Sequence, residues 1–132
     1  MQLADLRLQI DCRLAIVLMA VITLGACAGA ERTLLEQFFG ASRLRDRTAL
    51  QTVSTITFEP REQGIVRTFE ITGITPERLE GTNLVKEVTV EAPVILPDGQ
   101  TVRKTLVVTM QRAMDGLDAW TITGVADAAR HQ

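Results

Sequence analysis

Few residues in this chain of 132 residues have side chains suited to chemistry. It has two cysteines, Cys12 and Cys27, a single histidine and no tyrosine. A thiol can attack a substrate, ligate a metal or accept a covalent group, so its surroundings decide its use. Cys27 comes directly after an uncharged apolar run over residues 14–24 and the two small residues Gly25 and Ala26. This pattern is typical of an export signal that ends at the cysteine.

The length of the apolar run separates it from a membrane-spanning helix. As a helix, residues 14–24 would reach about 16 Å, against roughly 30 Å of hydrocarbon in a bilayer. Arg7 and Arg13 precede the run and supply the positive end of an export signal. The alternative is a buried core helix, which would carry a polar stripe, whereas this run has no polar residue before Thr23.

Residues Leu24, Gly25, Ala26 and Cys27 resemble the lipobox of bacterial lipoproteins, which is an aliphatic residue, two small residues and a cysteine. The resemblance implies a signal peptide over residues 1–26, a thioether-linked diacylglycerol on Cys27 and a further acyl chain, such as palmitate, on its new amino group. Two acyl chains hold a protein stably at a membrane. Ala28, in place of aspartate, resembles the address of lipoproteins sorted to the outer membrane, facing the periplasm. Residues 27–30 would then form a short lipidated leader.

One domain over residues 31–132 would remain after this processing, and it contains no thiol. Its core must therefore stabilise it without disulfides or cysteine-bound metal. Removing residues 1–26 takes away two arginines and two aspartates, so the formal net charge stays at −2. A nucleic-acid partner is not expected at this charge. The densest basic cluster, Arg43, Arg45 and Arg47, is interpreted as a solvated helix surface or turn, with an anion contact as the alternative.

Two helices are predicted at the start of the domain. Leu34, Leu35, Phe38, Phe39 and Ser42 recur at helical spacing and form one stripe. A second, short helix is predicted over 46–53, with Asp46 as N-cap and with Leu50 and Val53 on its buried side.

From residue 54 onward the period changes to two and β-branched residues dominate. The predicted strands cover residues 54–59, 65–74, 84–96, 101–112 and 117–125. Short links join them, so we expect an antiparallel meander of about five strands, with its surest hairpin turn at 97–100. Helices followed by strands indicate an α+β domain.

Alternation along the strands divides the sheet into a core face and a solvent face. The expected core face holds Val88, Val90, Ala92, Val94, Leu96, Val102, Leu106, Val108, Met110, Trp120 and Ile122. A threonine-rich set, including Thr89, Thr105 and Thr109, falls on the opposite face. Lys86 and Lys104 are in phase with the core face, and we expect their ammonium groups to reach water near strand ends. Gly73 and Gly124 are predicted to mark bulges or bends of a curved sheet.

The Phe38-Phe39 helix, the Arg45-Asp46 break, the Leu50 turn and the strand 120–124 together resemble the nuclear-transport-factor-like superfamily. The resemblance implies a cone, in which a curved antiparallel sheet wraps an N-terminal helix and encloses a pocket. A cystatin-like helix on a sheet is the neighbouring alternative. Enzymes of the superfamily, ketosteroid isomerases and polyketide cyclases, hold an aspartate base and usually a tyrosine or histidine in the cone.

This chain departs from those enzymes, because it has no tyrosine and its histidine, His131, is next to last. The carboxylates nearest to apolar positions are Asp46, Glu70 and Asp118, and each is interpreted as a cap, a strand residue or a turn neighbour. Glu87 and Glu91 share a strand face but stand about 13 Å apart, which is too far to chelate one ion. No catalytic residue, metal or cofactor is predicted, and the chain is not expected to be an enzyme.

The candidate pocket lining consists of the residues that would face the inside of a cone: Phe38, Phe39, Phe58, Phe69, Val90, Val108 and Trp120. Core packing is the competing interpretation of the same residues. Two functional hypotheses follow. In the first, the domain is a non-catalytic interaction or structural module that meets an envelope protein or its own copy through a sheet face or the 84–112 hairpin. In the second, the cone holds a small apolar ligand, with or without isomerase or cyclase chemistry.

Overall fold

The computed structural model describes residues 29–116 and 119–131, and the chain divides into two units, residues 1–31 and 32–132. Of the first unit the described residues are 29–31, which are helical. The lipobox, with Cys27, and the candidate carboxylate Asp118 lie outside the described residues. Across the part of the chain that is described, no helix has the length and apolar character needed to cross a bilayer. The remaining description concerns the second unit.

The helical prediction for the start of this unit is confirmed. Its first helix ends at residue 44, where Arg45 adopts a left-handed conformation with φ of 54°. The predicted stripe is buried, and Leu35 and Phe38 are 0% exposed. Asp46 is the N-cap of α2 (Arg47–Val53), since its Oδ1 accepts a hydrogen bond from the Ala49 amide at 3.0 Å.

The strand predicted over 54–59 is wrong. Ser54 makes an isolated parallel bridge with Ile122, and the chain then enters the short helix α3 (Pro60–Gln63). Proline suits this place because it lacks an amide hydrogen and its fixed φ matches the first turn of a helix. Residues 62–64, in the link between two predicted strands, are therefore the end of α3 and its C-cap, Gly64.

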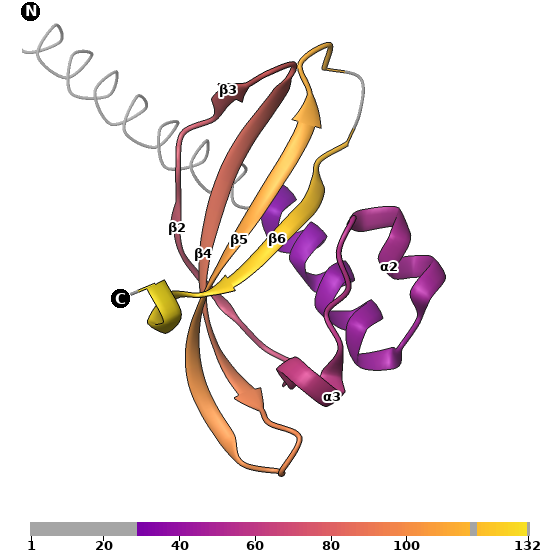
Figure 1. Ribbon diagram of the computed structural model, residues 1–132, viewed down its shortest axis with the longest axis vertical. Coiled ribbons are helices and arrows are strands. Elements are labelled where there is room, and N and C mark those ends of the chain that lie inside the picture. Colours follow the sequence, from indigo (N-terminus) through magenta and orange to yellow (C-terminus); the bar gives the residue numbers. More distant parts are fainter. Residues whose placement is uncertain (1–28, 117–118, 132) are drawn as a thin grey trace, which may run out of the picture. The chain divides into compact units, whose positions relative to one another are not determined.

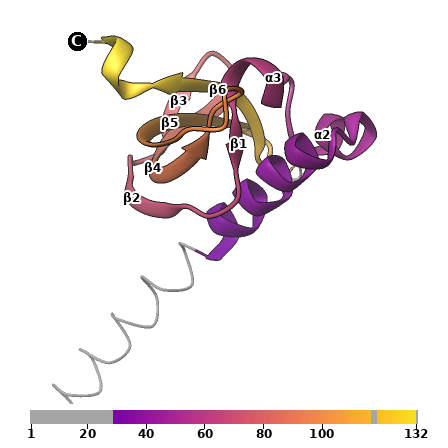
Figure 2. The same ribbon diagram turned by 90° about the horizontal axis from the view of Figure 1, so that it is seen from below.

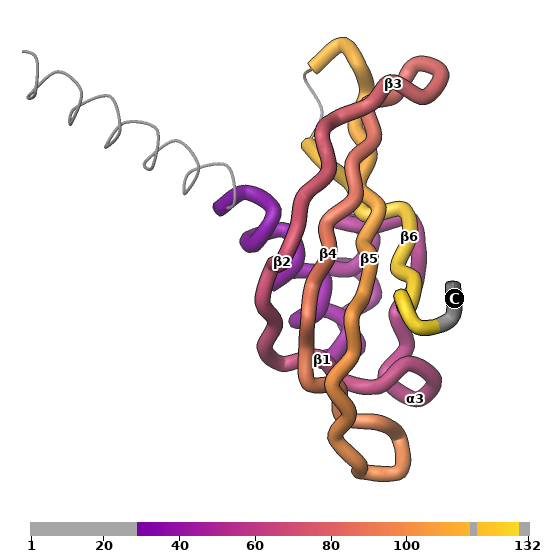
Figure 3. Tube along the Cα trace, turned by 90° about the vertical axis from the view of Figure 1, so that its left-hand side faces the viewer, coloured from indigo at the N-terminus to yellow at the C-terminus, as the bar shows by residue number. Residues whose placement is uncertain are grey.

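The six strands of the described residues form one antiparallel sheet, so the α+β class is confirmed, and the last four strands form the expected meander. They are β1 (Ile65–Val66), β2 (Glu70–Ile74), β3 (Arg78–Glu80), β4 (Asn83–Ile95), β5 (Thr101–Ala113) and β6 (Thr121–Asp127), followed by the 3₁₀ helix η1 (Ala128–His131). The three short strands all pair with β4 along one edge, and β5 and β6 follow on the other side, as Figure 3 shows. The strand predicted over 65–74 is thus interrupted, and β3 was not predicted.

Two bulges curl this sheet, and each is next to a glycine that the sequence marked. The register shifts between Ile71 and Gly73 on β2, and again opposite Thr109, where Gly124 pairs on β6. A bulge bends its strand and increases the local twist. Figures 1 and 2 show the long strands curling, with the first helix, drawn in indigo, along the inner side of the curl.

The core lies between the first helix and the inner face of the sheet, as the alternation predicted. Val102 is an exception, because it lies next to the hairpin turn and is 39% exposed. Val88, Val90, Val108, Met110 and Ile122 are all 0% exposed. The long hairpin turn is also where it was expected, because the Leu96 amide donates to the Gln100 carbonyl at 2.8 Å and Gly99 has φ of 89°.

The outer face of the sheet is polar and carries exposed ion pairs. Arg103 pairs with Glu91 at 2.9 Å, and Arg78 contacts Glu80 at 2.9 Å and Glu87 at 3.3 Å. The hydrogen bond from Arg78 to Glu80 raises the pKa of the Arg78 guanidinium. Exposed pairs of this kind add little to stability, so this face is best described as a solvated surface.

Candidate ligand pocket

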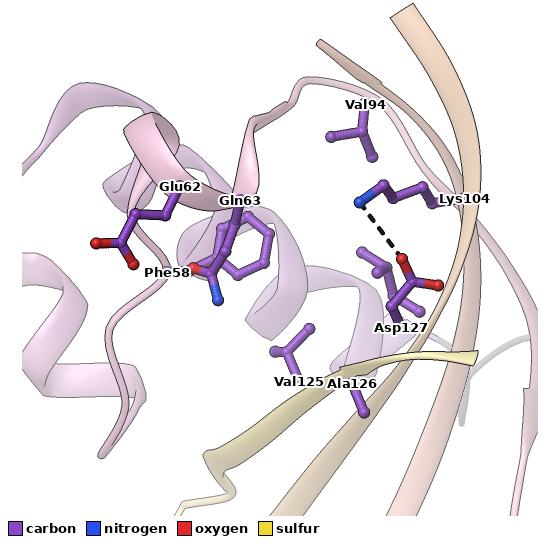
Figure 4. Close-up of a pocket in the computed structure, with 9 residues that line it drawn as sticks. Phe58, Glu62, Gln63, Val94, Lys104, Val125, Ala126 and Asp127 are labelled. Carbon is purple, nitrogen blue, oxygen red and sulfur yellow. Dashed lines mark ion pairs between the residues drawn. The ribbon is translucent and has the colours of Figure 1, made fainter. Parts of the chain in front are cut away.

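A pocket of about 450 Å³ opens between α3 and the inner face of the sheet. Its apolar walls are Phe58, Val94, Leu106 and Val125, and its polar groups are Glu62, Gln63, Lys104 and Asp127. Figure 4 shows α3 on one side of this space and the Lys104–Asp127 ion pair on the other. A hollow of this size that combines apolar walls with convergent polar groups can hold a small amphipathic molecule.

Close contacts fix the α3 wall of the pocket. The Ser42 hydroxyl, on the first helix, donates a hydrogen bond to the Phe58 carbonyl and so ties the segment before α3 to the core. At the other end of α3, Gly64 has φ of 89°, and a Cβ built on it would lie 2.7 Å from both the Ile95 carbonyl oxygen and Val94 Cγ1. A side chain at Gly64 would therefore push α3 away from β4.

Gln63 faces the pocket from α3 with its amide group already oriented. Its Oε1 accepts a hydrogen bond from the Glu59 amide at 2.8 Å, which caps the start of the helix. With the oxygen held there, the NH₂ group of the side chain is the part left to meet a ligand. The neighbouring Glu62 also lines the pocket, but Figure 4 shows its carboxylate directed away from the ion pair.

Lys104 and Asp127 face each other across β5 and β6. Leu106 pairs with Asp127 in the sheet register, so Lys104, two residues before Leu106, lies diagonally opposite on the same inner face. Lys104 Nζ lies 3.3 Å from Asp127 Oδ2, with side-chain exposures of 25% and 20%. Asp127 Oδ1 accepts a hydrogen bond from the Ala129 amide at the start of η1, at 3.1 Å. Both oxygens of this carboxylate are thus in use.

The seven candidate lining residues are divided between this pocket and the core. Phe58 lines the pocket. Phe38, Phe39, Val90 and Val108 are between 0% and 3% exposed, and Phe69 and Trp120 pack against that core from its margin. Rings of Phe38, Phe39 and Phe58 lie 5.2–5.8 Å apart, in tilted or edge-to-face contact. Side chains therefore fill the interior between the first helix and the sheet, and the hollow lies nearer the ends of the strands.

A second cationic group lies at the other end of the inner face, around Trp120. Lys86 Nζ is 4.0 Å from the centre of the Trp120 ring, and Arg112 Cζ is 5.0 Å from it. Lys86 is 6% exposed, so the expectation that its ammonium reaches water is wrong. The reason is that Trp120 covers the amine, where an aromatic face offers a cation a favourable contact.

The other candidate residues have structural partners or fall outside the description. Asp46 caps α2, and Glu70 lies exposed at the start of β2. His131 belongs to η1, and its side chain is not described. The arginines at 43, 45 and 47 are exposed around the break between the two helices. Within 29–116 and 119–131, no cluster of three or more histidine, cysteine, aspartate or glutamate side chains has metal-binding geometry.

Sequence reasoning missed the polar residues of the pocket, although part of the signal was present. Lys104 was noticed because it is in phase with the core face. Gln63 fell in the link between two predicted strands, and Asp127 lies two residues beyond the end predicted for the last strand. Comparisons of the chain with protein-family models, with curated proteins and with solved structures find no match.

Proposed function

We propose that this protein is a lipoprotein of the bacterial envelope whose folded unit binds a small amphipathic ligand. The anchor is Cys27, and the lipobox at 24–27 supports it, with Ala28 favouring the outer membrane and the periplasmic side. Metabolic labelling with a clickable fatty acid tests this part of the proposal. Label is expected on the wild type and on Cys12→Ala, the matched control, and is expected to be lost from Cys27→Ala. Label on Cys27→Ala, or an intact residue 1–26 segment in the cell, contradicts it.

The pocket under α3 is the observation that carries the binding role. Its volume of about 450 Å³ lies within the range of small-molecule sites, and it joins an aliphatic and aromatic wall to a Lys–Asp pair. A ligand with an apolar body and a polar end matches both parts. The cone interior, where superfamily enzymes hold their catalytic groups, is occupied here by Phe38, Phe39 and Val108. Binding is therefore proposed without a reaction. Membership of the nuclear-transport-factor-like superfamily stays a proposal, supported by the helix-first order and the curled sheet.

A blocking substitution tests the pocket. Val125 lines the pocket from β6, whereas Thr123, on the same strand, does not belong to its lining. We expect decanol, a simple amphiphile, to shift the NMR methyl signals of Leu106 and Val94 in the wild type and in Thr123→Phe, and to leave them unshifted in Val125→Phe. Unchanged methyl signals in the wild type, or equal shifts in both variants, contradict the proposed site.

A second candidate function, self-association, is favoured by the edge of β5 beyond β6, beside which η1 lies in place of a strand. β6 pairs with β5 from Leu106 onward, and no described strand pairs with that edge over residues 101–105. Such an edge can add a strand from another chain. A second copy is the proposed occupant, because lipid anchoring would concentrate copies of this chain on one membrane surface. Light scattering is expected to give a dimer mass for the 27–132 domain and a monomer mass for Arg103→Pro. A monomer at all concentrations contradicts this candidate.

A further inference from the structure

The polar end of the pocket offers hydrogen-bond donors on Lys104 and Gln63. Lys104 has three donors, and within the described residues Asp127 supplies the one acceptor at ion-pair distance. Their separation of 3.3 Å is longer than the 2.7–2.9 Å typical of a strong charged hydrogen bond. Figure 4 shows the ammonium extending from β5 into the space that faces α3. The remaining N–H groups of Lys104 are thus available to a ligand.

The acceptor oxygens beside Lys104 and Gln63 each already have one partner. Asp127 Oδ1 receives the Ala129 amide, and Oδ2 faces Lys104. Gln63 Oε1 receives the Glu59 amide, so its NH₂ remains for the pocket. Glu62 turns its carboxylate away from the pair. Both walls therefore keep donors that a ligand can use, on Lys104 and on the Gln63 amide.

We infer that the pocket is specific for an amphiphile with an acidic, hydrogen-bond-accepting head, namely a medium-chain carboxylate. This inference rests on the proposed binding role and goes further by naming the ligand class. The apolar chain would pack against Phe58, Val94 and Leu106, and the carboxylate would accept from Lys104 and from the Gln63 amide. Asp127 would compete with the ligand for Lys104. Its negative charge would therefore weaken the preference for a carboxylate, which depends on Lys104 and Gln63.

A comparison of three probes with one chain length tests the inference on the 27–132 domain. Titrations with decanoate, decanol and decyltrimethylammonium, followed by NMR, are expected to show decanoate binding about tenfold tighter than decanol, the worth of a charged hydrogen bond. The cationic probe is expected to bind weakest. If decanol and decanoate bind the pocket equally, or the cation binds tightest, the ligand class is wrong while the pocket stands. If none binds there, the proposed function itself fails.

Four variants assign the preference to named groups. Lys104→Met is expected to remove the preference for decanoate over decanol, whereas Arg103→Met, the adjacent cation on the outer face, is expected to retain it. Gln63→Glu keeps the oxygen that caps α3 and replaces the donor, so decanoate binding should weaken several-fold while decanol binding is unchanged. Asp127→Asn still accepts from the Ala129 amide and frees Lys104, so decanoate should bind more tightly. Weaker decanoate binding to Asp127→Asn, with the folded NMR spectrum intact, overturns the inference.

Discussion

The inner face of the sheet carries a lysine near each end, and the two ends differ. Lys104 lies beside a hollow, with a quarter of its side chain exposed and a carboxylate at 3.3 Å. Lys86 is buried under Trp120, with its amine 4.0 Å from the ring. Lys104 pairs with Ala92, six residues from Lys86 along β4, so the two positions are about 20 Å apart.

The difference between the two ends comes from what covers each of them. At the Trp120 end, a large ring and the Arg112 guanidinium fill the space beside the lysine. At the Lys104 end, the covering element is α3, one turn of helix that Gly64 lets approach β4. An indole ring fills space that a single helical turn leaves partly open. One end of the sheet is therefore built for packing, and the other leaves room for a ligand.

Of the substitutions at the two ends of the sheet, Trp120→Ala is expected to lower stability the most. The substitution removes a partly buried ring and the aromatic contact over the buried Lys86, so the free energy of unfolding should fall by about 3 kcal/mol. Urea denaturation followed by circular dichroism measures it. Trp120→Phe keeps an aromatic ring, so its free energy of unfolding should fall by less than half as much. Equal losses from the two variants would mean that the ring does not hold this end closed.

Gly64→Ala, at the pocket end, should lower the free energy of unfolding by about 2–3 kcal/mol. The added Cβ both strains a backbone with positive φ and clashes with β4. Gly99→Ala is a matched control, since Gly99 has the same φ of 89° with nothing within 4 Å of the added Cβ. Gly99→Ala should lower the free energy of unfolding by about 1 kcal/mol, because it adds backbone strain without a clash. Denaturation midpoints of the two variants give the comparison, and Gly64→Ala should also lose decanol binding. If both variants are destabilised equally, α3 can move away from β4 without loss of stability.

The sequence was sufficient for the elements whose signals are local and repeated. The stripe through Phe38, the cap at Asp46 and the alternation along β4 and β5 each depend on spacing within one segment, and each is confirmed. Gly73 and Gly124 marked the bulges because glycine in a strand has few other uses. The class of fold followed from the order of these elements.

The candidate site could not be read in the same way, because its residues meet only in the folded chain. Gln63, Lys104 and Asp127 come from three elements and share no spacing pattern. Residues 54–59 look like a strand by composition, yet Pro60 and the hydrogen bond from Ser42 to the Phe58 carbonyl direct the chain into α3. Of the two interpretations of the aromatic residues, core packing holds for Phe38 and Phe39, while Phe58 belongs both to the core and to the pocket wall.

Lys86→Ala should lower the free energy of unfolding by about 1–2 kcal/mol, because it removes a buried stem and the contact between its ammonium and Trp120. Lys86→Met keeps most of the stem and loses the charge, so it separates packing from electrostatics. Urea denaturation at low salt measures both variants. If Lys86→Met is as stable as the wild type, packing of the stem accounts for the effect, and the ring is not acting as a partner for the charge.

The smallest loss of stability is expected from Lys104→Ala, at the pocket end. The ion pair is partly solvated, and Asp127 keeps its hydrogen bond from the Ala129 amide when the lysine is gone, so the loss should stay below about 1 kcal/mol. Added salt should reduce this loss further, since screening weakens a solvent-accessible pair. Parallel denaturation of Lys104→Ala and Lys86→Ala at low and high salt gives the test. If Lys104→Ala loses as much stability as Lys86→Ala, the Lys104–Asp127 pair holds the fold together. A lysine needed for that role could not readily exchange Asp127 for a ligand.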